Sequence, residues 1–397
     1  MISEKMKGYV KNSSAIRAMF EEGKKMAAIY GRDHVYDFSL GNPNVAAPDE
    51  VKQAIIDVVT NEDPVLVHGY MNNSGYEDVR ETIAEHLNGL YGTKYAAGNL
   101  LMTVGAAGGM NVFFKTILNP GDEVVTFTPY FGEYRSYTAN YDGKLIEVPC
   151  DPVTFEPDVK ALEAALTPLT KIVIVNSPNN PTGAVYSKEC LEALAAVLEK
   201  KEKEFGTSIY LFSDEPYREI VFGDTEVPWI PSIYQNTVVG YSYSKSLSLP
   251  GERIGFLVMP SEIDDFADVT AAANTANRIL GFVNAPSLMQ RVAAKCVNAK
   301  TDVAYYAKNR QMLTEGLKAA GYTFVEPQGA FYLWLKSPEP DEKAFVAKAK
   351  ERQILIVPGS SFGCAGWVRI AYCVSNETVK NALPGFMEIA KEYGLGE

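Results

Sequence analysis

Histidine and cysteine are scarce in this sequence, and long apolar or basic runs are missing. The three histidines, at positions 34, 68 and 86, lack the spacing of metal ligands, so no metal site is expected. The five cysteines are odd in number and scattered, which indicates buried free thiols in a reducing cytoplasm. No stretch has the length of a membrane span, and the first residues lack the apolar region of a signal peptide. A cytoplasmic protein without a membrane partner is therefore expected.

Acidic residues outnumber basic ones by 49 to 37, which gives a formal net charge of −12. A moderately acidic chain without basic runs argues against nucleic acid or an anionic membrane as the main partner. At 397 residues the chain is too long for one simple core. It suits two domains or one elaborated α/β unit.

Short apolar runs alternate with helical segments between residues 100 and 260. Continuous apolar runs are typical of strands that are buried on both faces, hence of a mostly parallel sheet wrapped by helices. The predicted fold class is α/β with a seven-stranded sheet, and ligands of such sheets bind at the carboxyl ends of the strands. The predicted strands are 100–103, 123–127, 144–148, 172–176, 209–213, 237–241 and 254–259.

The pattern changes after Gly281, where a long helical stretch is predicted at 286–320. It is followed by shorter elements that predict a smaller α+β domain, packed with the N-terminal segment and its helix at about 14–30. We expect a large domain over 46–283 and a small domain formed by 1–45 and 284–397. The shorter elements are strands at 323–325, 331–335, 354–357 and 367–371, and helices at 342–351 and near 377–393.

One lysine lies between hydroxyl groups directly after a predicted strand. Ser242-Tyr243-Ser244-Lys245 follows the run 237–241, and Arg253 comes eight residues after the lysine. A lysine whose pKa is lowered can form a Schiff base with an aldehyde, and serine hydroxyls with a guanidinium can hold a phosphate. Alone this is a weak signal, because most lysines of this kind are solvated surface residues.

Other strands also run into loops suited to binding. The glycine-rich turn at 105–109 can hold a phosphate at the start of a helix, although small residues also serve close packing. The loop at 176–183 contains two prolines and a glycine, so it presents Asn180 rigidly. Asp214 ends a buried strand, where it either pairs with a cation or caps a helix.

Two further positions have both a structural and a functional interpretation. Phe131 lies in an aromatic segment, 129–134, that either packs in the core or stacks a ring on a flat cofactor. Gly41 begins the turn 41–44, which ends an apolar run and can also offer an N–H group to a ligand.

These motifs together resemble the class I/II aminotransferases of pyridoxal phosphate fold type I. The resemblance extends from Gly41 to Arg369, nearly the whole chain. Its core is Asn-Ser-Pro-Asn-Asn-Pro-Thr-Gly at 176–183, Asp214-x-x-Tyr217, Ser242-x-Ser244-Lys245 and Arg253, in that order. Further agreement comes from Tyr70 with Gly75 and Arg80, from Pro327-x-Gly329-Ala330-Phe331-Tyr332 and from Val368-Arg369-Ile370.

The resemblance implies roles around the cofactor ring. Lys245 would bind pyridoxal phosphate covalently and move a proton between the substrate Cα and the cofactor. Asp214 would keep the ring nitrogen protonated. Tyr217 and Asn180 would hydrogen-bond the phenolic oxygen of the ring, and Phe131 would stack on it.

The resemblance also implies phosphate and substrate contacts. The phosphate would be held by the N–H groups of Ala106 and Ala107 and by the side chains of Ser242, Ser244 and Arg253. Arg369 would bind the substrate α-carboxylate, helped by Asn180 and the N–H group of Gly41. Tyr70 would reach the phosphate from a second subunit, so a homodimer is implied.

The chain departs from the family in one turn. Many relatives have a hydroxyl or a glutamine at the place of 107–109, so phosphate contacts there are expected from the backbone alone. Some bacterial aspartate aminotransferases bind the distal carboxylate of the substrate through a lysine at the place of Ala107, so the simple inference of dicarboxylate specificity fails. Arg278 is an alternative partner for that carboxylate, and an ordinary surface arginine is the competing interpretation.

The predicted activity is transfer of the α-amino group of an L-amino acid to a 2-oxo acid, with aspartate and 2-oxoglutarate as the expected pair. A β-lyase acting on cysteine conjugates is one alternative, because the same cofactor chemistry can expel a leaving group. A non-enzymatic effector-binding protein is a more remote one. Transcription regulators of that kind carry a DNA-binding domain ahead of the fold, for which this chain is expected to leave no room.

Overall fold

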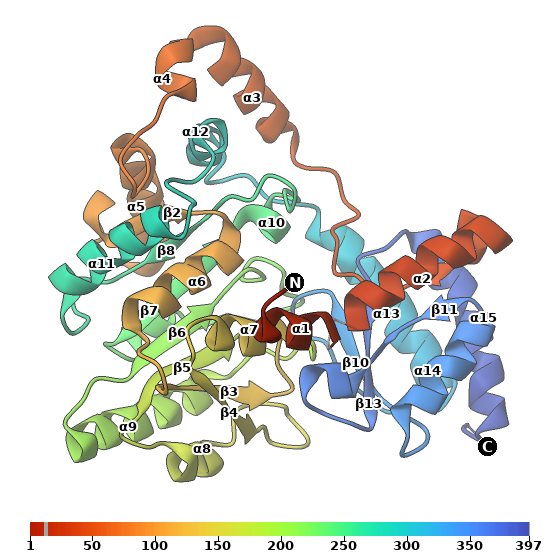
Figure 1. Ribbon diagram of the computed structural model, residues 1–397. Coiled ribbons are helices and arrows are strands. Elements are labelled where there is room, and N and C mark those ends of the chain that lie inside the picture. The colour runs from red at the N-terminus through yellow and green to blue at the C-terminus, as the bar shows by residue number, and fades with distance from the viewer. Residues whose placement is uncertain (12–14, 397) are drawn as a thin grey trace.

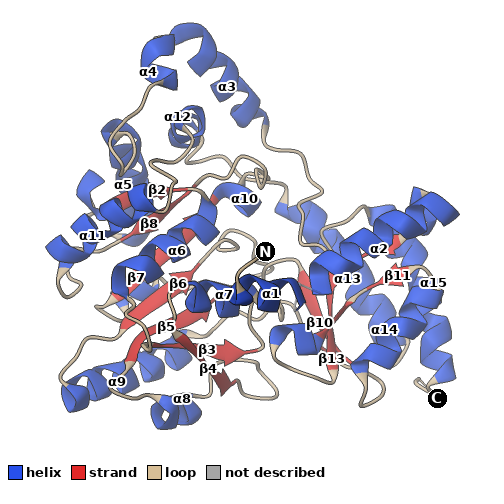
Figure 2. Ribbon diagram, in the orientation of Figure 1, coloured by secondary structure: helices blue, strands red, loops and turns tan. Residues whose placement is uncertain are grey.

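The computed structural model describes residues 1–11 and 15–396, and its largest element is a seven-stranded sheet (Figures 1 and 2). The strand order is β2-β8-β7-β6-β5-β3-β4. All neighbours pair in parallel except β8, which is antiparallel to both β2 and β7. The mostly parallel α/β sheet predicted from the sequence is thereby confirmed. The strands are β2 (Leu100–Thr103), β3 (Glu123–Thr128), β4 (Lys144–Pro149), β5 (Thr170–Asn176), β6 (Tyr210–Asp214), β7 (Thr237–Ser242) and β8 (Gly255–Val258).

Helices cover both faces of this sheet, because successive residues of a strand point to opposite sides. On one face Ile172 and Ile174 pack against α6 (Gly105–Ile117) and α11 (Phe266–Ile279). On the other face Val173 packs against α9 (Lys188–Phe205). Helix α7 (Glu133–Asn140) lies on the α6 side and α8 (Val159–Ala165) packs beside α9 (Figure 1). A sheet covered in this way leaves the ends of its strands for binding.

A second, four-stranded antiparallel sheet has the order β12-β13-β10-β9. The N-terminal segment joins this part of the molecule through β1 (Tyr36–Asp37), which pairs in parallel with β11 (Ile354–Leu355). The domain limits at 45/46 and 283/284 stay a prediction. The four strands are β9 (Phe324–Val325), β10 (Tyr332–Lys336), β12 (Val357–Pro358) and β13 (Trp367–Ala371), and the surrounding helices are α2 (Ala15–Tyr30), α13 (Val303–Ala319), α14 (Glu342–Glu351) and α15 (Asn376–Glu392).

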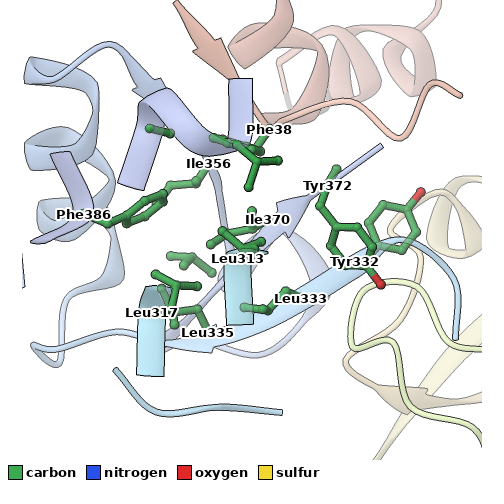
Figure 3. Packing of buried hydrophobic residues seen from close by; sticks show 14 of the residues in the cluster. Phe38, Leu313, Leu317, Tyr332, Leu333, Leu335, Ile356, Ile370, Tyr372 and Phe386 are labelled. Carbon is green, nitrogen blue, oxygen red and sulfur yellow. The ribbon is translucent and has the colours of Figure 1, made fainter. Parts of the chain in front are cut away.

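The core of this second part is built from large apolar side chains of several elements (Figure 3). Phe38, Leu313, Ile370 and Phe386 are almost fully buried in it. Complete burial of one such side chain stabilises the fold by about 1.5–3 kcal/mol. The core therefore fixes β10 and β13, which carry Tyr332 and Arg369.

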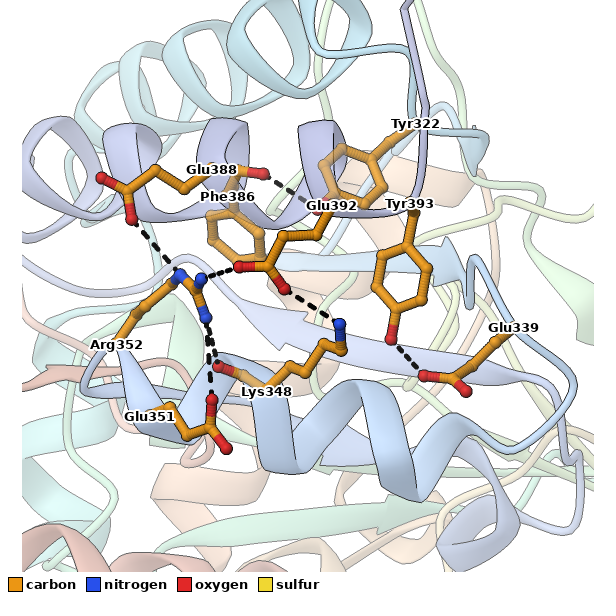
Figure 4. Close-up of polar contacts among 9 residues, drawn as sticks. All are labelled: Tyr322, Glu339, Lys348, Glu351, Arg352, Phe386, Glu388, Glu392 and Tyr393. Carbon is orange, nitrogen blue, oxygen red and sulfur yellow. Dashed lines mark hydrogen bonds and ion pairs between the residues drawn. The ribbon is translucent and has the colours of Figure 1, made fainter.

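Helices α14 and α15 are further held together at the surface by ion pairs (Figure 4). Lys348 Nζ lies 2.9 Å from Glu392 Oε2, and Arg352 pairs with both Glu392 and Glu388. Exposed pairs of this kind contribute at most about 1 kcal/mol each. Their effect is to fix the orientation of the two helices, while the apolar core supplies most of the stability.

The structure corrects several expectations about single elements. The predicted helix 286–320 is two helices, α12 (Ser287–Lys295) and α13, because Asp302 caps α13 by accepting a hydrogen bond from the N–H of Tyr305 at 3.1 Å. The predicted strand 354–357 is divided between β11 and β12. The start of the helix predicted at 14–30 falls partly outside the described residues. Four helices of the N-terminal quarter were not predicted: α1 (Glu4–Lys11), α3 (Asp49–Asn61), α4 (Pro64–His68) and α5 (Glu77–Tyr91).

The prediction that the cysteines are buried is only partly confirmed. All five are free, but Cys296 and Cys373 are buried whereas the other three are half-buried. None of the helices within residues 1–11 and 15–396 combines the length and the hydropathy that a bilayer crossing requires.

Candidate active site

A cavity of about 250 Å³ lies where the carboxyl ends of β5, β6 and β7 face β10 and β13. The structure brings nearly all of the predicted site residues into its wall, although they are spread over more than three hundred positions of the chain. The exceptions are Tyr70 and Arg278. The predicted residues in the wall are Gly41, Ala106, Ala107, Phe131, Asn180, Asp214, Tyr217, Ser242, Ser244, Lys245, Arg253 and Arg369.

Lys245 lies on α10 (Tyr243–Ser246), a short helix that directly follows β7. The Ser242 side chain caps this helix by accepting a hydrogen bond from the N–H of Ser244 at 3.1 Å. The Lys245 Nζ donates to the carbonyl oxygen of Gly41 at 2.6 Å. Burial lowers the pKa of Lys245 to about 8, and the charges of Arg369 and Arg253 act in the same direction. About a tenth of this amine is thus unprotonated at pH 7, far more than at the ordinary lysine pKa, and a nucleophilic lysine acts in that form.

One end of the cavity is built for an anion. The hydroxyl oxygens of Ser242 and Ser244 lie 2.7 Å apart, and α6 begins beside them without an acidic residue in its first turn. Gly105 adopts a φ of +69°, and a Cβ there would lie 3.0 Å from Nη2 of Arg253. The glycine therefore lets the guanidinium approach the helix N-terminus closely. Two hydroxyls, a guanidinium and free N–H groups are together the donors that a phosphate accepts from.

A buried carboxylate lies in another part of the wall. Asp214 ends β6, and its Oδ2 accepts a hydrogen bond of 2.5 Å from the hydroxyl of Tyr134. Burial raises the pKa of Asp214 to about 7, although the hydrogen bond from Tyr134 lowers it. The interpretation of Asp214 as a helix cap does not fit, because no helix begins at Asp214. Tyr134 was missed from the sequence, where its position three residues after Phe131 was the available signal.

Tyr217 lies three residues after Asp214, and its hydroxyl oxygen is 2.8 Å from that of Tyr332 on β10. Both side chains are buried. Tyr332 belongs to the motif at 327–332, which implied no role for it, and the structure places it in the cavity wall.

Arg369 on β13 is buried, with 2% of its surface exposed. Its Nη1 donates to Oδ1 of Asn180 at 3.0 Å, and its Nη2 donates to the carbonyl oxygen of Ser39 at 2.5 Å. Its Nε is buried and has no hydrogen-bond partner among the described residues. A buried guanidinium without a carboxylate partner is costly, which favours a site for a ligand anion such as a carboxylate.

Two predicted residues lie outside the cavity. Tyr70 follows α4, and its surface is 92% exposed. Arg278 is exposed on α11 and does not line the cavity. Neither residue reaches the site within a single protomer.

These residues fit pyridoxal phosphate. The anion site suits its phosphate, Lys245 suits its aldehyde, and Asp214 suits its ring nitrogen, because a buried carboxylate that is costly when charged gains from a cationic partner. Phe131 lines the same cavity and offers a ring for stacking. The fold and the site thus define an enzyme that uses pyridoxal phosphate through a lysine.

The chain belongs to the class I and II aminotransferases. Residues 33–386 match the sequence model of the family described as aminotransferase class I and II. The family uses pyridoxal phosphate, which establishes the cofactor, and the protein is an aminotransferase.

Individual relatives agree with this assignment. The aspartate/prephenate aminotransferase of Thermus thermophilus is 32% identical over 359 residues, which cover 88% of this chain and 90% of the relative. The aspartate aminotransferase of Pyrococcus horikoshii is 29% identical and covers 93% of each chain. Among solved structures, an amino transferase from Eubacterium rectale is 47% identical with a TM-score of 0.96 and covers 99% of both chains. The Thermus thermophilus aspartate aminotransferase with maleate has a TM-score of 0.84 at 28% identity and covers 95% and 97% of the two chains.

Proposed function

We propose that this aminotransferase takes L-aspartate as amino donor and 2-oxoglutarate as acceptor. The observation that carries the proposal is that Lys245, Asp214 and Arg369 line one cavity, so that an amino acid held by its carboxylate lies beside the lysine. Relatives named as aspartate aminotransferases support the choice of donor, as does the relative whose structure holds maleate, a dicarboxylate. These names also favour transfer over the β-lyase and non-enzymatic alternatives.

Each residue then has a defined task. Pyridoxal phosphate, when bound, supplies an aldehyde that condenses with amines and a ring that accepts negative charge from the substrate Cα. Lys245 would take the proton from the Cα of the donor and pass it to the cofactor, and in the second half-reaction it would deliver a proton to the Cα derived from the 2-oxo acid. Asp214 holds the proton on the ring nitrogen, and Tyr217 with Asn180 donates to the phenolic oxygen of the ring. Arg369 orients the substrate through its α-carboxylate.

The distal carboxylate of aspartate requires another cation. In the described part of the chain, the cations in the cavity wall are Lys245, Arg253 and Arg369, and each already has a task. Arg278 is the candidate of the sequence analysis, and because it is exposed on α11 it would serve only if a second subunit brought it to the site. Arg278→Ala should therefore raise the KM of aspartate and leave that of alanine unchanged.

The first experiment is an absorbance titration of the cofactor-loaded protein with L-aspartate and no acceptor. Loss of the visible absorbance with formation of oxaloacetate is the expected result. An unmoved spectrum would overturn aspartate as donor, and the same titration with neutral, aromatic and sulfur amino acids would then identify the donor class.

The enzyme is further proposed to be a homodimer with Tyr70 contributed across the interface. Tyr70 is exposed, and so are the apolar side chains of Val65 and Leu66 on the neighbouring helix α4, at 76% and 63%. Exposed apolar side chains grouped in this way are typical of a surface that a partner covers. A molecular mass near 43.5 kDa in solution light scattering would exclude the dimer.

A cytoplasmic location, proposed from the free thiols, can be checked by cell fractionation.

A further inference from the structure

Tyr332 contacts three residues to which separate roles have been assigned. Its hydroxyl oxygen lies 2.8 Å from that of Tyr217, and the Cζ atom of Arg369 lies 4.6 Å from the centre of its ring. A Cβ added at Gly41 would fall 2.0 Å from the same hydroxyl oxygen. The side chain is 2% exposed and lines the cavity. Tyr332 is therefore a fixed part of the site and not a surface group that happens to lie near it.

The ring of Tyr332 restrains the carboxylate-binding arginine. A guanidinium within about 6 Å of an aromatic ring centre is attracted to the ring face. Arg369 is buried, and its Cζ atom also lies 4.8 Å from the centre of the Phe362 ring. Its orientation is set by the hydrogen bonds to Asn180 and Ser39 and by these two rings, of which Tyr332 is one.

The hydroxyl of Tyr332 also restrains the loop that contacts the lysine. Because that hydroxyl occupies the place of a Cβ at residue 41, a larger residue there would displace it. The carbonyl oxygen of Gly41 accepts the hydrogen bond from Lys245 at 2.6 Å. The position of Tyr332 thus affects the environment of Lys245 through Gly41.

The two hydroxyls share one hydrogen bond, in which either can donate. Tyr217 has a single O–H group, so once it donates to an acceptor in the cavity its oxygen is left to accept. The Tyr332 hydroxyl then donates to the oxygen of Tyr217. Hydrogen bonds in such a chain strengthen one another, so a donor behind Tyr217 makes Tyr217 a stronger donor in front.

We propose that Tyr332 is a positioning residue: its hydroxyl strengthens the hydrogen bond from Tyr217 to the phenolic oxygen of bound pyridoxal phosphate, and its ring orients Arg369. The inference rests on the proposed role of Tyr217 and is independent of which amino acid is the donor.

The test is a pH titration of the visible absorbance of the cofactor-loaded protein without substrate. Hydrogen bonds to the phenolic oxygen stabilise the deprotonated form of the lysine-linked cofactor, so weaker bonds raise the pH midpoint of the absorbance change. Tyr332→Phe is expected to raise the midpoint by about 0.5–1 pH unit, the equivalent of one neutral hydrogen bond. Tyr217→Phe should raise it further, and adding Tyr332→Phe to that variant should change nothing more.

Tyr372→Phe is the matched control. Tyr372 is fully buried in the same core (Figure 3), and its hydroxyl donates to the carbonyl oxygen of Ala330 at 3.3 Å, outside the cavity wall. The pH midpoint of the absorbance change in Tyr372→Phe should equal that of the native protein. A native midpoint for Tyr332→Phe, or an equal shift for both variants, would overturn the inference. An unmoved midpoint in Tyr217→Phe would remove the proposed role of Tyr217 as well, so the two failures can be told apart.

The ring contact has its own measurement. Tyr332→Phe keeps the ring on Arg369 and should leave the KM of the amino donor within about twofold, whereas Tyr332→Leu should raise it about threefold to thirtyfold. Equal KM values in the two variants would exclude the ring contact. Because Tyr332→Leu also changes the core, its midpoint of thermal unfolding is compared with that of Tyr372→Leu.

Discussion

Nη1 of Arg369 donates to Oδ1 of Asn180 at 3.0 Å, and this hydrogen bond joins the two sheets across the cavity. Arg369 belongs to β13 of the four-stranded sheet, whereas Asn180 lies in the loop after β5 of the seven-stranded sheet. The backbone N–H of Asn180 donates in turn to Oδ1 of Asn176 at 2.7 Å. The proposed carboxylate site is therefore shared between both parts of the molecule.

Arg369→Lys should raise the KM of the amino donor about 100-fold and change kcat less. Lysine keeps the charge but loses the planar fork, and with it about two charge-assisted hydrogen bonds of roughly 1.5 kcal/mol each. The measurement is steady-state kinetics with the donor varied. Arg310→Lys is the control, because Arg310 contacts Pro327 and Glu326 and does not line the cavity. An unchanged KM in Arg369→Lys would place the substrate carboxylate elsewhere.

The proposed dimer predicts that two inactive variants restore activity when mixed. Lys245→Ala should lose the visible absorbance of the lysine-linked cofactor and at least 100-fold in turnover, while Tyr70→Ala should bind the cofactor weakly. In a mixed dimer one site combines the native Lys245 of one subunit with the native Tyr70 of the other. After unfolding and refolding together, about a quarter of native activity is expected from random pairing. If the mixture is no more active than its two components, Tyr70 does not act across subunits.

The polar residues that follow the strands could be predicted from the sequence, because their positions follow from the topology of the sheet. Asp214 and Lys245 come directly after apolar runs, and parallel strands bring their carboxyl ends to one edge of a sheet. The phenolic partners Tyr134 and Tyr332 could not be assigned in this way. Each one forms its hydrogen bond with a residue of another element, 80 and 115 positions away, so the pairing depends on three-dimensional packing.

Local breaks were also hard to predict. The stretch 286–320 has helical periodicity, but the Asp302 cap starts a new helix within it. Capping depends on one side chain, which periodicity averaged over many residues does not detect.

Removing the charge of Lys245 should stabilise the cofactor-free protein at neutral pH. The pKa of Lys245 is lowered from 10.5 to about 8 by burial, so below pH 8 the folded protein carries a buried charge that the unfolded chain keeps in water. Lys245→Met should raise the free energy of unfolding at pH 7 by up to about 3 kcal/mol. Between pH 8 and 10.5 the unfolded state of the native protein binds more protons than the folded state, so the free energy of unfolding of the native protein rises with pH. The difference in free energy of unfolding between Lys245→Met and the native protein therefore becomes smaller.

Urea unfolding of the cofactor-free proteins at pH 7 and pH 10 measures this difference. Lys115→Met, on the exposed side of α6, is the control for replacing a lysine by methionine. The lowered pKa would be contradicted if the difference in free energy of unfolding between Lys245→Met and the native protein stayed constant or grew from pH 7 to pH 10.

The last prediction concerns Tyr134, whose hydroxyl donates to Oδ2 of Asp214 at 2.5 Å. This hydrogen bond stabilises the carboxylate and so lowers the pKa of Asp214, against the larger effect of burial, which raises it to about 7. Tyr134→Phe removes the donor and keeps the ring. The pKa of Asp214 should then rise further, by roughly 1–2 units for a hydrogen bond to a charged group.

The proposed role of Asp214 requires its charged form, so the acidic limb of the pH profile of kcat should move to higher pH in Tyr134→Phe. Turnover near neutral pH falls, and it recovers as the pH is raised through the new pKa, which a general loss of folding would not produce. Tyr141→Phe serves as control, because the Tyr141 hydroxyl donates to Asn111 at 3.2 Å and not to a residue of the cavity wall. If both variants show the native acidic limb, Tyr134 does not set the charge of Asp214 in the loaded enzyme, and the positive charge of the bound cofactor ring alone keeps that carboxylate ionised.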